Sequence, residues 1–181
     1  MWNSLEIAKL IVAALAPASI GVVGYFINKR IRDLERDEWK NRKAIEKRIA
    51  LFDDIGPKLN ALYCFLKWVG DWQKLSPADV VDTKRQLDKT VFTYRYILGD
   101  EVFAAYNAFM ELAFRMYHTP GKDALIRSTI VDPLGNRRES PHYAWKPEWE
   151  YAFDEANAAK KEDIDAAYAR LMKAFTAAIG L

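Results

Sequence analysis

Residues 10–27, LIVAALAPASIGVVGYFI, decide the fold that we expect for this chain. They form an uncharged apolar run of about 18 residues, close to the length with which an α-helix crosses a hydrocarbon core of roughly 30 Å. The basic sequence NKRIR follows at once, at residues 28–32. We therefore predict one membrane-spanning helix that anchors the chain in a lipid bilayer.

Three other interpretations of this run compete with a span. A buried core helix can be apolar on all sides, but such helices are usually shorter and rarely end in a basic cluster. A cleaved signal peptide needs a positively charged start, and its one candidate site, at residues 14–16, is followed by Pro17. A helix lying in the membrane surface needs a charged face, which this run lacks. The spanning helix is the favoured interpretation.

The basic residues also predict an orientation. Only Lys9 precedes the run, whereas residues 28–48 contain Lys29, Arg30, Arg32, Arg36, Lys40, Arg42, Lys43, Lys47 and Arg48. Positive flanks remain on the cytoplasmic side, so we expect a single-pass protein of the inner (cytoplasmic) membrane with its C-terminal domain in the cytoplasm. The single cysteine, Cys64, suits a reducing compartment because one thiol cannot form an internal disulfide.

Small residues within the run predict a face for self-association. Ala14, Ala18 and Gly21 fall on one side of a helix, and such small residues let helices approach closely in lipid. This face makes a homo-oligomer a candidate state. It also suggests an alternative function, an oligomerising membrane effector such as those of bacterial anti-phage defence.

The sequence predicts an all-α protein in three parts. Residues 1–28 are the transmembrane anchor, residues 29–55 a charged helical stalk, and residues 56–181 a cytosolic bundle of about four to five helices. The bundle signals include a break at Gly56-Pro57, a cap at Ser76-Pro77 and a last helix at 162–179. We expect the helix that begins after Ser76 to reach Leu98, and the next one, capped at Gly99-Asp100, to reach Tyr117.

The stalk carries a thin apolar stripe at helical spacing. Glu38, Asn41 and Arg48 interrupt its heptad pattern, so a simple stalk is favoured over a coiled coil. A weak oligomerisation helix is the alternative. The apolar members of the stripe are Ile31, Leu34, Ile45, Ile49 and Phe52.

An irregular connection at residues 118–146 is long for a compact domain. It brings cations close in sequence to aromatic side chains, a combination that can hold a phosphate and stack a base. A nucleotide-like ligand sensor using residues 118–149 is therefore an alternative function, against a solvated loop whose aromatics pin it to the bundle. The candidate anion-binding or ligand-binding residues are Arg127, Arg137, Arg138, His142 and Trp145.

Other chemistries find no support in the sequence. His118, His142 and Cys64 are not at metal-ligand spacing, and no phosphate-binding glycine loop or nucleophile elbow occurs, so we expect no metal, no cofactor and no catalysis. The net charge of +2 gives no general attraction to nucleic acid. The expected function is a membrane-anchored, non-enzymatic interaction module on the cytoplasmic face, with a protein partner that the sequence does not identify.

The chain also resembles small bacterial single-pass membrane proteins with a helical cytosolic domain. The resemblance is carried by FINKRI at the end of the apolar run, ALYCFLKWVGDW at 61–72, SPADVVDTKRQLDKTVFTYRYIL at 76–98 and GKDALIR at 121–127. It covers nearly the whole chain. It implies the same architecture and an association with mobile elements or antiviral systems, but it implies no activity.

Overall fold

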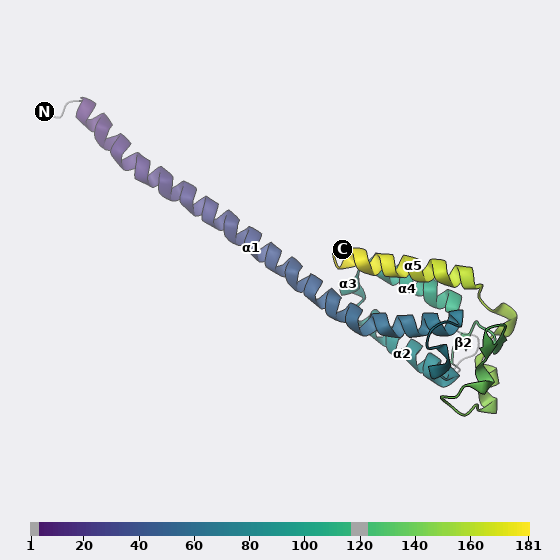
Figure 1. Ribbon diagram of the computed structural model, residues 1–181. Helices are drawn as coiled ribbons and strands as arrows, with labels where there is room; N and C mark the ends of the chain where they lie inside the picture. Colours follow the sequence, from purple (N-terminus) through teal and green to yellow (C-terminus); the bar gives the residue numbers. More distant parts are fainter. Residues whose placement is uncertain (1–3, 117–122) are drawn as a thin grey trace. The chain divides into compact units, whose positions relative to one another are not determined.

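Helices make up most of the computed structural model, as the sequence predicts, and the strands are few and short (Figure 1). The structure describes the backbone of residues 4–116 and 123–181, and the side chains of residues 24–116 and 123–181. The chain divides into two compact units, Met1–Ala44 and Ile45–Leu181. This boundary falls inside the predicted stalk, so residues 45–55 belong to the second unit.

The first helix, α1, runs without interruption from Ser4 to Lys67. The break predicted at Gly56-Pro57 is therefore wrong. A proline inside a helix removes one backbone hydrogen bond and costs about 3 kcal/mol or more. Here Ile55 and Leu59, on either side of the proline, are fully buried, and each contributes roughly 1.5–3 kcal/mol by leaving water. Packing of this face offsets the local penalty.

The predicted membrane span lies mostly outside the residues whose side chains are described. Among the residues whose side chains are described, no helix is long and apolar enough to cross a bilayer. Only residues 24–27 of the predicted run 10–27 belong to the described side chains. The span therefore stays a prediction.

The helix α2, Pro77–Thr93, begins where the sequence predicts. The Ser76 hydroxyl accepts a hydrogen bond from the Asp79 backbone N–H at 3.3 Å, and the Asp79 carboxylate accepts one from the Ser76 N–H at 2.9 Å. This reciprocal capping box satisfies two donors at the helix start. The prediction of a start at Ser76-Pro77 is confirmed.

The predicted end points of the next two helices need correction. The helix expected to reach Leu98 ends at Thr93, and a short helix, α3, covers Arg95–Leu98. Gly99, with φ of +93°, then allows the chain to turn into α4, Asp100–Ala113. α4 ends before the predicted Tyr117, which lies outside the described residues, because Phe114 takes an extended conformation and pairs with a strand.

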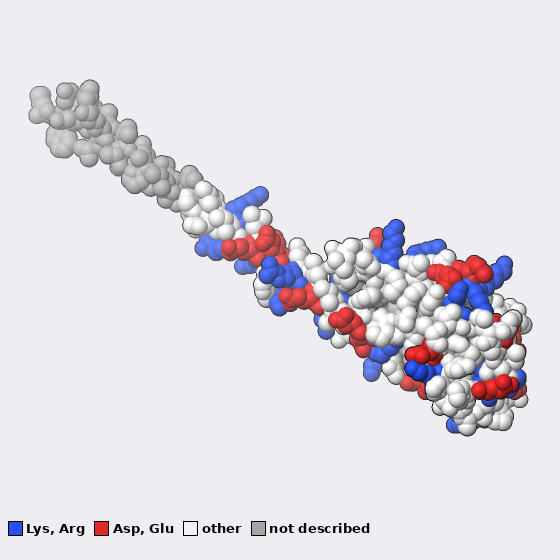
Figure 2. Space-filling view, viewed as in Figure 1, with Lys and Arg blue, Asp and Glu red and all other residues white. Residues whose placement is uncertain are grey.

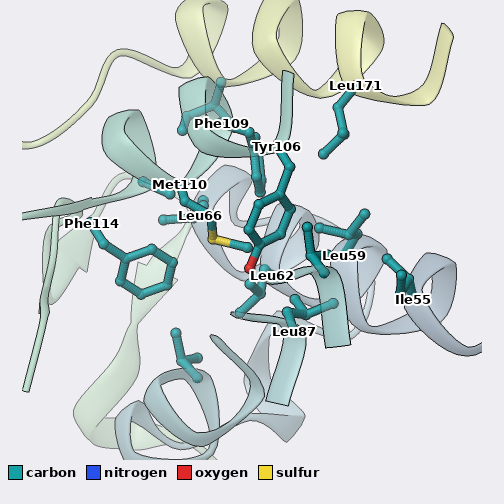
Figure 3. Packing of buried hydrophobic residues seen from close by; sticks show 14 of the residues in the cluster. Ile55, Leu59, Leu62, Leu66, Leu87, Tyr106, Phe109, Met110, Phe114 and Leu171 are labelled. Atoms are coloured by element: carbon teal, nitrogen blue, oxygen red, sulfur yellow. The ribbon is translucent and has the colours of Figure 1, made fainter. Parts of the chain in front are cut away.

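The core of the second unit forms where α1, α2 and α4 meet the last helix, α5, Lys161–Ala178. Figure 3 shows side chains from all four helices converging on one another. The predicted last helix at 162–179 is thus confirmed with a shift of one residue at each end. Fully buried core residues include Ile55, Leu59, Leu62, Leu87, Tyr106, Phe109 and Leu171.

The connection between α4 and α5 is more ordered than the sequence predicts. Two short antiparallel pairs form within it, β1 (Phe114–Arg115) with β2 (Leu125–Ile126) and β3 (Val131–Asp132) with β4 (Gly135–Asn136). Three short 3-10 helices also lie in the connection: η2 (Arg137–Glu139), η3 (Pro147–Ala152) and η4 (Glu155–Asn157). A further one, η1 (Trp72–Lys74), precedes α2.

Candidate functional site

Arg137, one of the predicted ligand-binding residues, is fully buried in the second unit. It begins η2 directly after the β3–β4 hairpin, which places its side chain against the end of α1. Its guanidinium carbon lies 3.6 Å from the ring centre of Phe65 and 3.8 Å from that of Trp68. At these distances the cation is attracted to both ring faces.

The hydrogen bonds of Arg137 explain why it is held at this point. Its Nε donates to the Thr129 carbonyl at 2.9 Å, and its Nη2 donates to the Phe65 carbonyl at 2.8 Å and to the Ser128 hydroxyl at 3.1 Å. The Phe65 carbonyl belongs to the last turn of α1, where carbonyls have no partner within the helix. Arg137 therefore caps α1 and joins it to the connection.

The residue that follows α1 supports this arrangement. Trp68 has φ of +62°, a left-handed conformation that a glycine usually provides at a helix end. For a bulky residue this conformation is strained. It turns the Trp68 ring under the Arg137 guanidinium, and Trp68 is buried there. This pairing could not be predicted from the sequence, because Trp68 and Arg137 lie far apart along the chain.

The charge of Arg137 is balanced by rings and carbonyls. Burial lowers its pKa from 12.5 to about 9, while the electrostatic effects of Tyr143 and Asp132 act in the opposite direction. The guanidinium is therefore still protonated at neutral pH. Within the described part of the chain, no carboxylate forms an ion pair with it and its Nη1 has no hydrogen-bond partner. Arg137 thus acts as a structural clamp.

Two other predicted residues lie close together in the connection, where Arg138 is exposed and Trp145 is partly buried against the core. Arg138 contacts the Glu150 carboxylate through Nε at 3.1 Å and Nη2 at 2.9 Å. Its guanidinium carbon lies 5.9 Å from the ring of Trp145, which also meets Trp149 edge to face. This group joins η2 to η3.

The last two predicted residues are held elsewhere. Arg127 donates to two backbone carbonyls, those of Asn157 at 2.9 Å and Glu111 at 3.1 Å. His142 is exposed, and its backbone N–H donates to the Ser140 hydroxyl at 3.1 Å. The predicted set is therefore dispersed, with Arg137 in the interior, Arg138 and Trp145 as a pair, and the other two apart. Whether any of them binds a ligand stays a prediction.

A groove that the sequence did not reveal lies between the start of α2 and η3. Its volume is about 410 Å³. Arg85 and Asp123, which form an ion pair, and Tyr151, which is 84% exposed, are among its lining residues. Glu148 also lines the groove. Apolar and aromatic side chains beside a few charged groups are typical of surfaces that bind other molecules. The apolar and aromatic lining includes Pro77, Val81, Leu125, Trp149 and Ala152.

A second, wider pocket lies between the end of α4 and η4. Asp154 is buried in its wall, with one carboxylate oxygen accepting from the Asn157 amide at 2.9 Å. Its other oxygen lies 3.5 Å from the Arg115 guanidinium. This buried acid is partnered by groups of its own unit, so the pocket has a balanced mixture of charges rather than one sign.

The predicted oligomerisation face of Ala14, Ala18 and Gly21 lies outside the described side chains. Among the described residues, no group of three histidine, cysteine or carboxylate side chains is placed to hold a metal ion. No family model, curated protein or solved structure matches the chain.

Proposed function

We propose that this chain is a membrane-anchored helical interaction module, without catalytic activity of its own, that holds its second unit at the cytoplasmic face. The observation that carries the proposal is the order of residues along α1. An uncharged apolar run at 10–27 is followed directly by the basic stretch 28–48. This order is typical of a span with its positive flank inside.

The described end of the apolar run supports the proposal. Tyr25, Phe26 and Ile27 are 60%, 62% and 54% exposed. Water disfavours three adjacent large apolar side chains, whereas the membrane interface favours aromatic rings beside basic residues. A bilayer would cover these side chains at the point where the charges begin.

The anchor is tested by carbonate extraction of membranes that contain the full chain. The Ala16→Lys/Ile20→Lys variant places two charges in the middle of the run, at a cost of about 3 kcal/mol each. It should move to the carbonate-soluble fraction. The control, Ser4→Lys/Asn28→Lys, adds the same charge at the ends and should stay in the membrane. Equal extraction of both variants and of the wild type would reject the anchor.

The orientation is tested with a single reporter thiol in full-length chains in which Cys64→Ser removes the native one. Asn28→Cys should react with a membrane-impermeant maleimide only after the bacterial cells are permeabilised. Asn3→Cys, before the run, should react in intact cells. The reverse pattern would place the second unit outside.

We further propose that the groove between α2 and η3 receives the protein partner. Tyr, Trp and Arg side chains dominate the binding energy of many interfaces, and this groove presents Trp149, Tyr151 and Arg85 together. An extended peptide with apolar side chains and one charged residue would match its apolar wall and its Arg85–Asp123 pair.

A photo-cross-linking amino acid at two exposed tyrosine positions tests this surface. Tyr151 lies at the groove, whereas Tyr96 is 91% exposed on α3 and is not part of the groove lining. In cells that express the full chain, a discrete adduct should form from position 151 and not from position 96. Adducts from position 96 alone would show that the partner binds outside the groove. Identical adducts from both positions would show that the contacts are non-specific.

A further inference from the structure

The part of α1 in the first unit leaves an apolar stripe uncovered. Every residue from 25 to 47 is exposed. The stripe begins with Ile27, Ile31 and Leu34, which are 54%, 45% and 57% exposed. Most helices in water depend on packing of one face for their stability, so this stripe requires a covering partner.

The spacing of the stripe fits a heptad repeat. With Ile31 at position a, Ile27 and Leu34 occupy position d, and the next a and d positions are Glu38 and Asn41. A buried polar residue in such a seam costs stability, and the Asn41 amide can pair with the same residue of a second helix only when the two helices are in register. Glu38 weakens the seam, because it places like charges near one another.

Charges beside the stripe are complementary to those of a second copy. Arg30 and Asp37 occupy position g, and Glu35 and Arg42 occupy position e. In a parallel, in-register pair each g residue faces the e residue five places further along the other helix. Arg30 then faces Glu35 of the second copy, and Asp37 faces Arg42. Figure 2 shows acidic and basic side chains interspersed along this part of α1.

An antiparallel pair does not fit the same residues. Aligning Glu35 with Arg42 of an antiparallel copy would set Ile31 opposite Arg48. Arg48 is already used in the second unit, where it donates to the Ile97 carbonyl at 2.6 Å and to the Ala178 carbonyl at 2.9 Å. The next pairing would need Phe52, which packs on Phe175. The parallel, in-register arrangement brings both charge pairs together and uses only exposed residues.

We propose that residues 27–41 bind a second copy of this chain as a parallel, in-register helix pair. Two heptads with a glutamate in the seam associate weakly by themselves. The inference therefore rests on the proposed anchor, which would keep two copies parallel in one membrane and raise their effective concentration.

Oxidative cross-linking of the full chain in membranes tests the seam. In a Cys64→Ser background, the Leu34→Cys and Asn41→Cys variants should each give a disulfide-linked dimer, because d positions of parallel helices face each other. The matched control, Arg36→Cys, lies on the opposite face at position f and should stay monomeric. Using two seam positions guards against one substitution disturbing the helix.

Charge exchange tests the orientation of the pair. In the Asn41→Cys background, Glu35→Arg should reduce the dimer band because it sets Arg30 against a second arginine. Adding Arg30→Glu should restore the band in a parallel pair. An antiparallel pair would not recover, since there Glu35 would face Arg42.

Carbonate extraction of the same samples separates the two proposals. Membrane-bound chains that cross-link equally at positions 34, 36 and 41, or at none of them, would reject the helix pair and keep the anchor. Extractable chains that still cross-link at 34 and 41 would reject the anchor and keep the pair. A product of other than twice the chain mass would reject a second copy as the occupant.

Discussion

Arg137 is the most deeply buried charged residue in the described part of the second unit. A methionine at this position would remove the donor to the Thr129 carbonyl and would leave the Phe65 carbonyl with only the Trp68 backbone N–H, at 3.4 Å. Each unsatisfied buried group costs about 1–3 kcal/mol, so we expect Arg137→Met to lower the free energy of unfolding by about 2–4 kcal/mol. Urea unfolding followed by tryptophan fluorescence measures this loss.

The neighbouring arginine is the control for this prediction. Arg138 forms an exposed pair with Glu150, and exposed pairs contribute about 0–1 kcal/mol. Arg138→Met should therefore lower stability by less than about 1 kcal/mol. If the two variants were equally destabilised, the clamp role of Arg137 would be wrong.

Asp165, on α5, should give the second unit part of its acid sensitivity. Its pKa lies below 3.8 because the Lys67 ammonium and then the Tyr63 hydroxyl donate to its carboxylate. A carboxyl whose pKa is lower in the folded state stabilises the fold above its unfolded pKa, and that contribution is lost as the pH falls through the folded value. Asp165→Asn should therefore flatten the dependence of unfolding free energy on pH below about pH 4.

Urea titrations at several pH values between neutral and acid measure that slope. Asp163→Asn changes an exposed residue of the same helix and should leave the slope as it is in the wild type. A wild-type slope in Asp165→Asn would show that the bonds from Lys67 and Tyr63 do not favour the charged carboxylate.

The difference between Ser76 and Arg137 shows how much could be predicted at the scale of residues. The partners of Ser76 lie within three positions, so the local sequence was sufficient to predict the cap. Arg137 meets Phe65, which lies 72 positions earlier. Its short-range pattern, a basic residue near aromatics, is equally typical of a ligand loop and of a buried clamp. Only the tertiary fold distinguishes them.

Among the helices, α2 depends on its first turn for part of its stability. Ser76→Ala removes the hydroxyl that accepts from Asp79, and loss of such a cap costs about 1 kcal/mol. The midpoint of thermal unfolding, followed by circular dichroism, should fall accordingly. Ser76→Thr keeps a hydroxyl and should retain most of the stability. An unchanged midpoint in Ser76→Ala would show that water replaces the cap without loss.

The continuity of α1 through Gly56-Pro57 rests on burial of the face that the proline interrupts. Leu59 is fully buried, and replacing a buried leucine with alanine costs about 2–5 kcal/mol. Leu59→Ala should therefore lower the unfolding free energy by that amount in urea titrations. Leu134→Ala, at a residue 59% exposed on a turn, should change it by less than about 0.5 kcal/mol. A small loss of unfolding free energy in Leu59→Ala would show that burial of this face does not explain the continuity of α1 through the proline.

The helix α1 shows why helix ends were harder to predict than helix starts. A proline after a glycine usually ends a helix, and the sequence contains no sign that neighbouring residues compensate. The compensation comes from α2, α4 and α5, whose core residues pack on the same face. A helix start depends on nearby side chains, and the start of α2 at Ser76-Pro77 was predicted correctly. The end of α4 was not predicted correctly, because it depends on strand pairing with the distant residues 125 and 126.

For the molecule as a whole, the helical class was predictable, whereas the unit boundary after Ala44 has no counterpart in the pattern of apolar residues. Helical spacing of apolar residues continues across the boundary between Ala44 and Ile45, so the pattern by itself does not separate exposed from buried helix. The change appears in the structure as a change of burial, from residues that are all exposed to a core that includes Leu51 and Ile55. The groove between α2 and η3 was likewise invisible, because it combines residues near positions 80, 124 and 150.

The clamp at Arg137 also bears on how the protein responds to ionic strength. Mobile ions screen attractions between exposed opposite charges, such as those of Lys74 with Asp71 and Arg138 with Glu150. Arg137 is held by ring faces and carbonyl dipoles in a place that solvent ions do not reach. Concentrated salt should therefore loosen the surface pairs while the connection stays docked on α1. The contacts of Arg137 between the connection and α1 should therefore tolerate salt, although they depend on a positive charge.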